Sequence, residues 1–385
     1  MAALEEDVRA ERELFRDSVR RFIDNEIRPH YEDWEEAEAF PREVWTQLGE
    51  AGLLCLDVPE AYGGAGADFA LSAVVLEELG RAGMGGLATA VSVHSDVVTP
   101  YLLDLGSDAQ KEHWLPRMVA GEAVIGIGMT EPGAGSDLQG MRTRADRDGD
   151  GWVLNGAKTF ITNGIYADVM VIAARTRPEG GARGTSLFLV DTSLPGFRRG
   201  RNLRKLGQHA GDTAELFFED LRLPDDAILG REHQGFIHLI DELPRERLAL
   251  AVAAVAAAEG MIEWTADYVR ERKAFGQPLS SFQNTRFRLA EMRTDAAVTR
   301  AFVDQCMDRF RAGTLDVTTA AMAKLSSTEM QWRVADGCLQ LFGGYGYMRE
   351  YPIARAFADA RVQRIYGGTS EIMKELIARD MLGKA

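Results

Sequence analysis

The segment from Gln283 to Arg311 constrains the fold of this chain most strongly, because it contains neither glycine nor proline. Residues at helical spacing fall on one side of this segment and form a largely apolar face: Leu289, Met292, Ala296, Thr299, Val303, Met307 and Phe310. A second long helical segment, Arg245 to Lys273, precedes it and is interrupted only by Gly260. Residues 251–258 of that segment are rich in alanine, which lets helices pack closely. Three or four such helices predict a bundle.

The N-terminal third of the chain also shows helical spacing. Apolar residues recur at helical intervals up to the Arg28-Pro29 pair, where the run ends: Leu14, Phe15, Val19, Phe22, Ile23 and Ile27. Val44 to Leu53 and Leu71 to Leu79 predict further helices.

The sequence pattern changes near Gly121, where short segments rich in β-branched and aromatic residues begin to alternate with turn residues. Asp148-Gly149-Asp150-Gly151 predicts a hairpin, and strands are expected at Val169–Ala174, Ser186–Val190 and Ala214–Phe218. Strands spaced by turns, without long helices between them, indicate a β-barrel or sandwich. We therefore expect an α+β multidomain chain with a helical domain at 1–122, a β domain at 123–235 and a helical bundle at 236–385.

Composition narrows the classes of function. The chain has 385 residues, 46% hydrophobic and 27% charged, which is ordinary for two or three globular domains. Its net charge of −15 argues against a nucleic-acid partner and against an anionic membrane surface. We find no apolar run long enough to span a bilayer, no close cysteine pair and no metal-ligand spacing among the histidines. These features predict a cytoplasmic protein without a metal site.

Two motifs in the β region carry groups that suit a flat polar ring. Met-Thr-Glu-Pro-Gly-Ala-Gly-Ser-Asp at 129–137 offers loop amides and hydroxyls that could hold a polar ring edge or a phosphate, although a plain turn would have the same composition. In Lys-Thr-Phe-Ile-Thr-Asn-Gly at 158–164, Phe160 and Thr162 would share one face of a strand. There the pair could stack on a ring and hydrogen-bond its edge, or simply be a core phenylalanine and a surface threonine.

Three motifs in the C-terminal region suit a phosphate or another anion. Arg270 to Gly276 puts positive charge at a helix end, which can meet a pyrophosphate or favour the helix dipole. The three glycines in 340–347 indicate a ligand or close packing. In Arg364 to Ala378, Gly367-Gly368 breaks the helical pattern, and Thr369 or Ser370 can cap the helix that follows. Such a helix start can bind an anion or be an ordinary join.

Taken together and in this order, the motifs resemble the acyl-CoA dehydrogenase family over nearly the whole chain. The matching stretches are Thr-Glu-Pro-Gly-Ala-Gly-Ser-Asp, Lys-x-Phe-Ile-Thr-Asn-Gly, Asp212–Phe218, Arg272–Gly276 and Phe342–Gly346. The resemblance implies an N-terminal helical domain, a middle β-barrel and a C-terminal four-helix bundle, assembled as a homotetramer that is a dimer of dimers. It also implies FAD, an acyl-CoA substrate and transfer of electrons to an electron-transfer flavoprotein, in fatty acid β-oxidation.

The resemblance also implies a role for each matching residue. FAD would contact Met129, Thr130, Gly135, Ser136, Phe160, Thr162, Arg272, Phe275, Gln283, Gln340, Gly343, Gly344, Thr369 and Glu371, with Gln340 to Gly344 supplied by a neighbouring subunit. The acyl-CoA would contact Ser136, Arg247, Tyr366 and Gly367.

The position of the catalytic base departs from the common family pattern. Many members carry a glutamate base just before the final Gly-Thr, where this chain has Gly367. A minority, including long-chain and isovaleryl-CoA dehydrogenases, carry it on a helix at the position of Glu246. Pro244 predicts that this helix begins near Arg245, and by spacing alone Glu246 would be a solvated surface residue. The resemblance nevertheless makes Glu246 the base and assigns the Gly367 backbone N–H to the thioester oxygen.

Two alternatives to an acyl-CoA dehydrogenase remain at this point. One is an oxidase on the same fold that reoxidises its flavin with oxygen. The other is a catalytically inactive FAD- and acyl-CoA-binding regulatory protein, for which the absence of a glutamate at position 367 is the main argument. The sequence leaves open the length and branching of the acyl chain, and whether the role is catabolic or biosynthetic.

Overall fold

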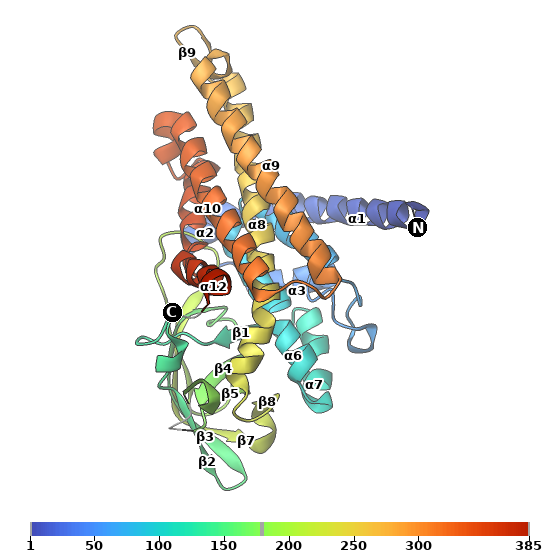
Figure 1. Cartoon of the computed structure of the whole chain (residues 1–385), viewed down its shortest axis with the longest axis vertical. Coiled ribbons are helices and arrows are strands. Elements are labelled where there is room, and N and C mark those ends of the chain that lie inside the picture. Colours follow the sequence, from blue (N-terminus) through green and yellow to red (C-terminus); the bar gives the residue numbers. More distant parts are fainter. Residues whose placement is uncertain (1, 178–180, 384–385) are drawn as a thin grey trace.

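The computed structural model describes residues 2–177 and 181–383 and has a helical N-terminal region, a β-sheet and a bundle of long helices (Figure 1). The N-terminal helices are α1 (Ala2–Phe22), α2 (Tyr31–Ala37), α3 (Glu43–Glu50), α4 (Phe69–Arg81), α5 (Gly85–Ser92), α6 (Thr99–Leu105) and α7 (Asp108–Val119). Two π-helical segments, η1 (Ile23–Ile27) and η4 (Val93–Val98), join helices within this region. The predicted end of the first helical run at Arg28-Pro29 is confirmed. Pro29 lies in a short 3-10 turn, Arg28–His30, that directly follows η1.

The middle of the chain forms one sheet. Its strands are β1 (Ile125–Gly128), β2 (Arg144–Asp148), β3 (Gly151–Thr162), β4 (Val169–Arg175), β5 (Thr185–Asp191), β6 (Phe197–Asn202), β7 (Thr213–Pro224) and β8 (Ile228–Leu229). The three strands expected from sequence and the hairpin are confirmed, the last by the pairing of Asp148 with Gly151. The strand order is β6-β7-β3-β2-β4-β5-β8, with β1 beside β4, so among the described strands the sheet is open at β6 and β8.

The C-terminal bundle consists of α8 (Gly235–Glu271), α9 (Gln283–Arg311), α10 (Val317–Phe342), α11 (Pro352–Val362) and α12 (Ser370–Leu382). Helix α9 has the bounds predicted from its lack of glycine and proline, and Met292, Ala296 and Val303 of its predicted face are buried. Helix α10 packs against α8, α9, α11 and α12 and is the centre of the bundle. The predicted cap of α12 is confirmed, since the Thr369 hydroxyl accepts a hydrogen bond from the Ile372 N–H at 3.3 Å.

Helix α8 begins earlier than the sequence predicts. It starts at Gly235, so Pro244 lies inside the helix and Glu246 is several turns from its beginning. With 37 residues it is about 55 Å long and runs from the sheet to the far tip of the bundle (Figure 1). By length and composition it could cross a membrane, contrary to the expectation of no such run, but 67% of its most apolar window is buried inside the protein.

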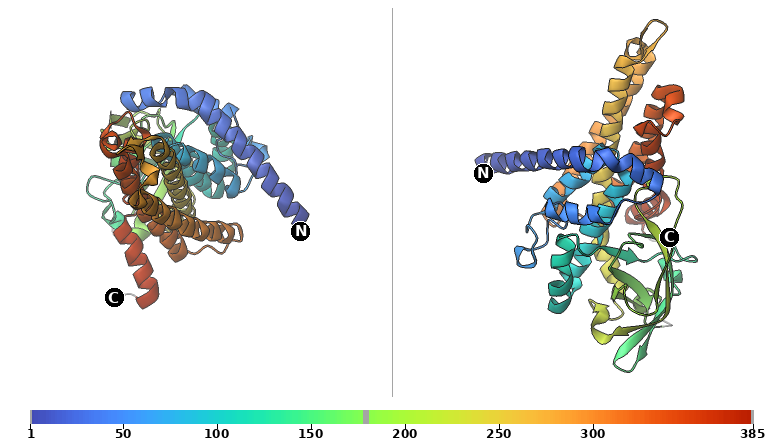
Figure 2. Two further views of the ribbon diagram at one scale, coloured as in Figure 1. Left: turned by 90° about the horizontal axis from the view of Figure 1, so that it is seen from above. Right: turned by 180° about the vertical axis from the view of Figure 1, so that it is seen from behind.

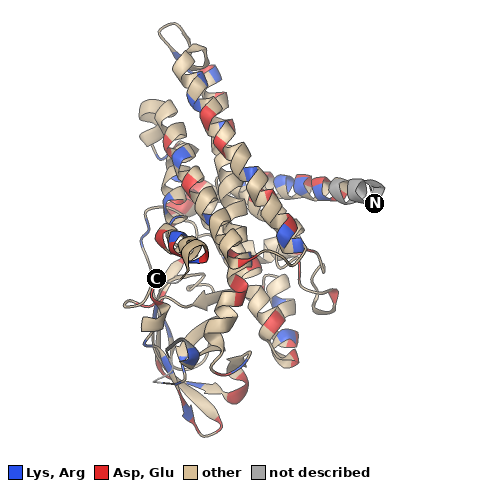
Figure 3. Ribbon diagram, in the orientation of Figure 1, with Lys and Arg blue, Asp and Glu red and all other residues tan. Residues whose placement is uncertain are grey.

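The two ends of the chain project from the compact body. Figure 2 shows α1 extending away from the other N-terminal helices and α12 leaving the bundle on another side. In the view of Figure 3, lysines and arginines are interspersed with aspartates and glutamates along the helices.

Glycines allow the close contact between α4 and α8. A Cβ on Gly80 would lie 3.0 Å from the carbonyl oxygen of Ala253, and one on Gly260 would overlap the backbone of Arg81. The sequence-based expectation that small residues permit close helix packing is therefore confirmed for this pair. The contact fixes α8 against the N-terminal region at a point between the sheet and the bundle tip.

We expect Gly260→Ala to lower the unfolding free energy. Alanine has the better helix propensity by about 1 kcal/mol, but overpacking costs about 1–3 kcal/mol and here the clash is with backbone that cannot change rotamer. Urea unfolding followed by circular dichroism measures the net change. A higher midpoint for the variant would contradict the tight contact between α4 and α8.

Candidate active site

The Glu246 side chain is buried in the centre of the protein, contrary to the expectation from its two arginine neighbours. Only 6% of the residue is exposed. Its Oε1 accepts a hydrogen bond from the Tyr101 hydroxyl at 2.7 Å. Burial raises the pKa of the Glu246 carboxyl to about 7, while the Tyr101 hydrogen bond and the Arg247 charge act in the opposite direction. A carboxyl with this pKa can exchange a proton near neutral pH.

Tyr101 is a site residue that sequence reasoning missed. It lies on α6, is fully buried and is separated from Glu246 by 145 positions in the chain. No motif in the sequence links the two helices. Only the packing of α6 against α8 brings the phenol to the carboxylate.

The glycine pair at 367 and 368 forms a tight loop that faces the same stretch of α8. Both residues have positive φ angles, 62° and 91°, which glycine adopts without strain. A Cβ on Gly367 would overlap the Leu250 side chain, which lies one helical turn after Glu246. The loop and the Glu246 carboxylate therefore lie within about one turn of each other along α8. This juxtaposition of Gly367 and Glu246 is the one that the family resemblance requires.

Two side chains of α10 anchor this loop. The buried Lys324 ammonium donates a hydrogen bond to the Gly368 carbonyl at 2.7 Å. Glu329 accepts hydrogen bonds from the Ser370 hydroxyl at 2.7 Å and from Arg364 at 2.8 Å. Within the described chain, the N–H of Gly367 has no hydrogen-bond partner and so remains available as a donor.

Positive charge gathers beneath the loop. Arg247 is only 3% exposed, and its Nε and Nη1 have no hydrogen-bond partner in the described part of the chain. Burial, followed by repulsion from Arg247, lowers the pKa of Lys324 to about 8. Tyr366 lies on the same loop, with its hydroxyl 3.4 Å from that of Thr89. Of the predicted substrate residues, the structure therefore brings Arg247, Tyr366 and Gly367 together.

The predicted ring-binding motifs meet at the ends of β1 and β3. Met129 and Thr130 directly follow β1, and the Thr130 carbonyl accepts a hydrogen bond from the Thr159 N–H at 2.9 Å. The buried Lys158 ammonium lies 2.8 Å from Glu131, whose carboxylate also accepts hydrogen bonds from the backbone N–H groups of Arg142 and Thr143. Gly135 and Ser136 are exposed on the loop beyond.

Phe160 projects into solvent from an irregularity in β3. The register of β3 against β7 shifts between Lys158 and Ile161, and Phe160 has a φ of 60°. Beyond this bulge burial still alternates, since Ile161 is buried between the more exposed Phe160 and Thr162, as expected if these two share a face. Phe160 is 69% exposed, whereas Thr162 is half-buried. An exposed phenylalanine next to Thr159, whose N–H bonds the Thr130 carbonyl, fits stacking on a flat ring.

The predicted diphosphate-binding residues lie at the tip of the bundle. Arg272, Gln340, Gly343 and Gly344 line one concavity of about 560 Å³, and the Arg272 guanidinium lies over the Tyr345 ring. Gly343 and Gly344 have no neighbouring atoms where a Cβ would be, so a ligand can approach their backbone. Beside the concavity, Phe275 is 95% exposed and Gln283 begins α9.

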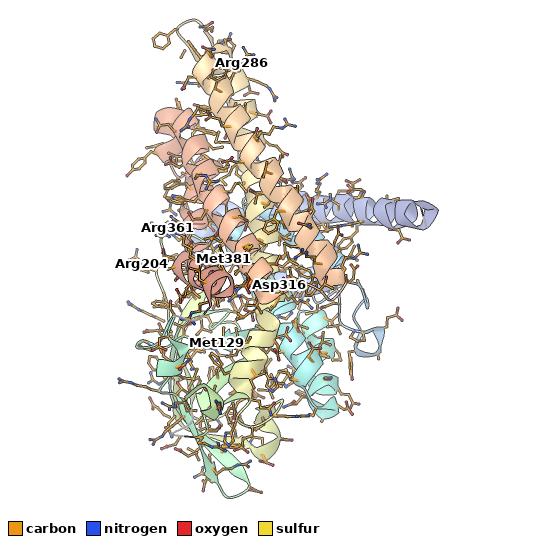
Figure 4. All side chains as sticks on the ribbon, viewed as in Figure 1. Met129, Arg204, Arg286, Asp316, Arg361 and Met381 are labelled. Carbon is orange, nitrogen blue, oxygen red and sulfur yellow. The ribbon has the colours of Figure 1, made fainter. Side chains whose placement is uncertain are left out.

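Arg272 and Gln340–Gly344 belong to the same surface of one chain, which corrects the expectation that a neighbour supplies only the second group. Figure 4 shows Met129 beside the sheet and Arg286 at the far tip of α9. The helical path from Glu246 to the end of α8 alone is about 38 Å, longer than an extended FAD molecule. The residues predicted to bind the ring and those predicted to bind the diphosphate therefore lie too far apart in one chain to hold the same FAD.

The remaining predicted cofactor residues follow the glycine loop. Thr369 caps α12 and Glu371 lies exposed in its first turn. With Gly367 and Gly368 before them, they form a helix entrance of free and capped N–H groups, which suits a polar or negative ligand.

Comparison with known proteins identifies the family to which this chain belongs. The family models described as acyl-CoA dehydrogenase N-terminal, middle and C-terminal domains match residues 9–122, 126–221 and 233–382. The chain belongs to the acyl-CoA dehydrogenase family. It is an oxidoreductase that acts on acyl-CoA thioesters, and its cofactor is FAD.

Individual relatives cover almost the whole chain. The mitochondrial long-chain specific acyl-CoA dehydrogenase of Sus scrofa is 50% identical over 97% of this chain and 87% of its own. The crystal structure of an acyl-CoA dehydrogenase from Geobacillus kaustophilus has a TM-score of 0.94 at 49% identity, covering 97% and 98% of the two chains. A glutaryl-CoA dehydrogenase from Mycobacterium smegmatis in complex with FADH2 has a TM-score of 0.91 at 33% identity, covering 97% and 95%.

We expect Lys324→Met to lower kcat about tenfold to a hundredfold with little change in KM. The variant keeps the length of the side chain but removes the hydrogen bond that fixes the Gly368 carbonyl, and small displacements of a positioned group cost up to about a hundredfold. Steady-state kinetics with a saturating acyl-CoA measures this change. Lys374→Met, at an exposed position on α12, is the control, and equal kcat values for both variants would contradict the anchoring role.

Proposed function

We propose that this protein desaturates fatty acyl-CoA thioesters between the α and β carbons, with Glu246 as the base that removes the α proton. The observation that carries the proposal is the buried Glu246 carboxylate within one helical turn of a glycine loop that has a free N–H. FAD, when bound, supplies the acceptor for the hydride that leaves the β carbon.

The environment of Glu246 suits proton removal from carbon. The α C–H of a thioester is a weak acid, so the base must be desolvated and must not be held by a strong ion pair. Glu246 meets both conditions, because it is buried and its hydrogen-bond partner among the described residues is the uncharged Tyr101 phenol. With a pKa of about 7, a large share of Glu246 is ionised at neutral pH.

The glycine loop and its surroundings suit the thioester oxygen, where negative charge develops. The Gly367 N–H is a donor without a partner among the described residues, and Lys324 and Arg247 place buried positive charge behind it. Fixed donors and charges of this kind stabilise a developing oxyanion most strongly where water is excluded. Gly367 needs no side chain for this role, and none would fit without displacing Leu250.

The identity of 50% to a long-chain specific enzyme supports a long straight acyl chain as the substrate class. We further propose that FAD is held between two copies of the chain, because its ring-binding and diphosphate-binding residues lie too far apart within one copy. A homotetramer, an electron-transfer flavoprotein as electron acceptor and a cytoplasmic location complete the proposal, all from the family resemblance and composition.

We expect long straight acyl-CoAs to bleach the flavin absorbance of the purified protein within seconds under anaerobic conditions. Glu246→Gln should retain its yellow FAD and bleach about 10²- to 10⁴-fold more slowly, because a positioned base contributes about that factor. Stopped-flow absorbance with straight and branched acyl-CoAs measures both rates.

The matched control is Glu242→Gln, one turn earlier on α8, where burial and the carboxyl of Asp104 also raise the pKa. This variant should bleach within a few-fold of the wild-type rate. Equal bleaching by Glu246→Gln and wild type would contradict the assignment of the base. Rapid reoxidation of the bleached flavin by air would favour the oxidase instead.

A further inference from the structure

The contact between Tyr101 and Glu246 places the two carboxylate oxygens of Glu246 in different environments. Oε1 accepts the Tyr101 hydrogen bond at 2.7 Å. Oε2 has no hydrogen-bond partner in the described chain. Unlike the buried side-chain atoms that also lack a partner, it is not fully enclosed. Oε1 is therefore anchored, whereas Oε2 is unpaired among the described residues and retains some accessible surface.

The backbone around Tyr101 is fixed in an unusual way. Helix α6 follows directly on the π-helical segment η4, and a π turn adds a residue that rotates the following helix by about 100°. His94 of η4 is fully buried and bridges two elements, with Nε2 at 3.1 Å from the Met118 carbonyl and Nδ1 accepting from the Ile125 N–H at 3.3 Å. These bonds hold η4 between α7 and β1 and so set the direction in which Tyr101 points.

We propose that Tyr101 is a positioning residue for the base: its phenol holds Oε1 of Glu246 so that Oε2 alone is presented to the substrate α proton. The proposal rests on the proposed function of Glu246. In this arrangement the phenol remains a donor throughout the reaction, and the proton from carbon is taken up by Oε2.

The charges around this pair favour a donor role for the phenol. Charged and titratable groups face the pair from three helices: Asp241, Glu242 and Arg247 on α8, Asp104 on α6 and, behind Arg247, Lys324 on α10. Burial and then the negative charge of Glu246 raise the pKa of Tyr101 well above its usual value, so the phenol keeps its proton. A protonated phenol stabilises the ionised carboxylate and not the protonated one.

The direct test is the pH dependence of kcat/KM for the holoenzyme carrying Tyr101→Phe. The loss of a hydrogen bond to a charged group should move the acidic limb to higher pH by about one unit or more, because such bonds stabilise the charged form by that amount. At pH 6 the variant should therefore be at least about tenfold slower, whereas well above pH 8 most of this difference should disappear.

Tyr31→Phe is the matched control, since Tyr31 is also buried and its hydroxyl accepts a hydrogen bond from the Gly86 N–H. Its acidic limb should coincide with that of the wild type. If Tyr101→Phe lowers kcat/KM equally at all pH values, Tyr101 is only a packing residue and the proposal is overturned.

A second experiment does not depend on activity or on the folding of Tyr101→Phe. Replacing Tyr101 with 3-fluorotyrosine keeps its shape but makes the phenol a stronger donor, so the Glu246 carboxyl should titrate at lower pH. Carbon-13 NMR of glutamate-labelled protein, with Glu246→Gln used to assign the signal, measures this titration. An unmoved titration would overturn the positioning role, whereas a shifted titration with no flavin bleaching by any acyl-CoA would reject the proposed function alone.

Discussion

The desolvation of the Glu246 carboxylate is the interaction on which the rest of the active site depends. Burial in the packed centre of the protein raises its proton affinity to a range in which it can take a proton from carbon near neutral pH. That burial is produced by helices from both ends of the chain, since α4 and α6 pack against α8 from the N-terminal region and α10 packs against it within the bundle. The close α4–α8 contact at Gly80 and Gly260 holds one of these helices against α8.

The structure explains why a glycine can stand at the position where many relatives carry the base. The loop at Gly367 and the α8 position of Glu246 face each other across one helical turn, so a carboxylate from either side can reach the same space. In this chain Leu250 fills the room next to Gly367, and the buried carboxyl group is that of Glu246 on α8. The backbone of the loop retains its N–H donor. Lys324 holds the loop in place through the Gly368 carbonyl, whether the loop or α8 carries the base.

Local features were predictable from the sequence. The bounds of α9, the Asp148–Gly151 hairpin and the Thr369 cap depend on neighbours a few residues away, and all three are confirmed. The family motifs also predicted which residues bind the cofactor and assigned the base to Glu246. They could not show the burial of Glu246, because Pro244 suggested a helix start that the packing of α8 overrides.

Contacts between residues far apart in the chain could not be predicted from the sequence. Tyr101 and Lys324 stand outside every motif, and they reach the site only through the packing of α6 and α10. The bulge that exposes Phe160 depends on the register of β3 against β7, which alternation along one strand does not reveal. The distance between the two sets of cofactor residues likewise emerges only from the length and direction of α8.

The most direct test of the account separates proton removal from hydride transfer. A 3-thia-acyl-CoA has sulfur in place of the β carbon, so it offers an acidic α hydrogen but no hydride. Incubated in heavy water with the FAD-loaded protein, it should exchange its α hydrogens for deuterium, as followed by proton NMR, and Glu246→Gln should abolish the exchange while still binding the ligand. Exchange at the wild-type rate in Glu246→Gln would show that another group removes the proton and would contradict the central claim.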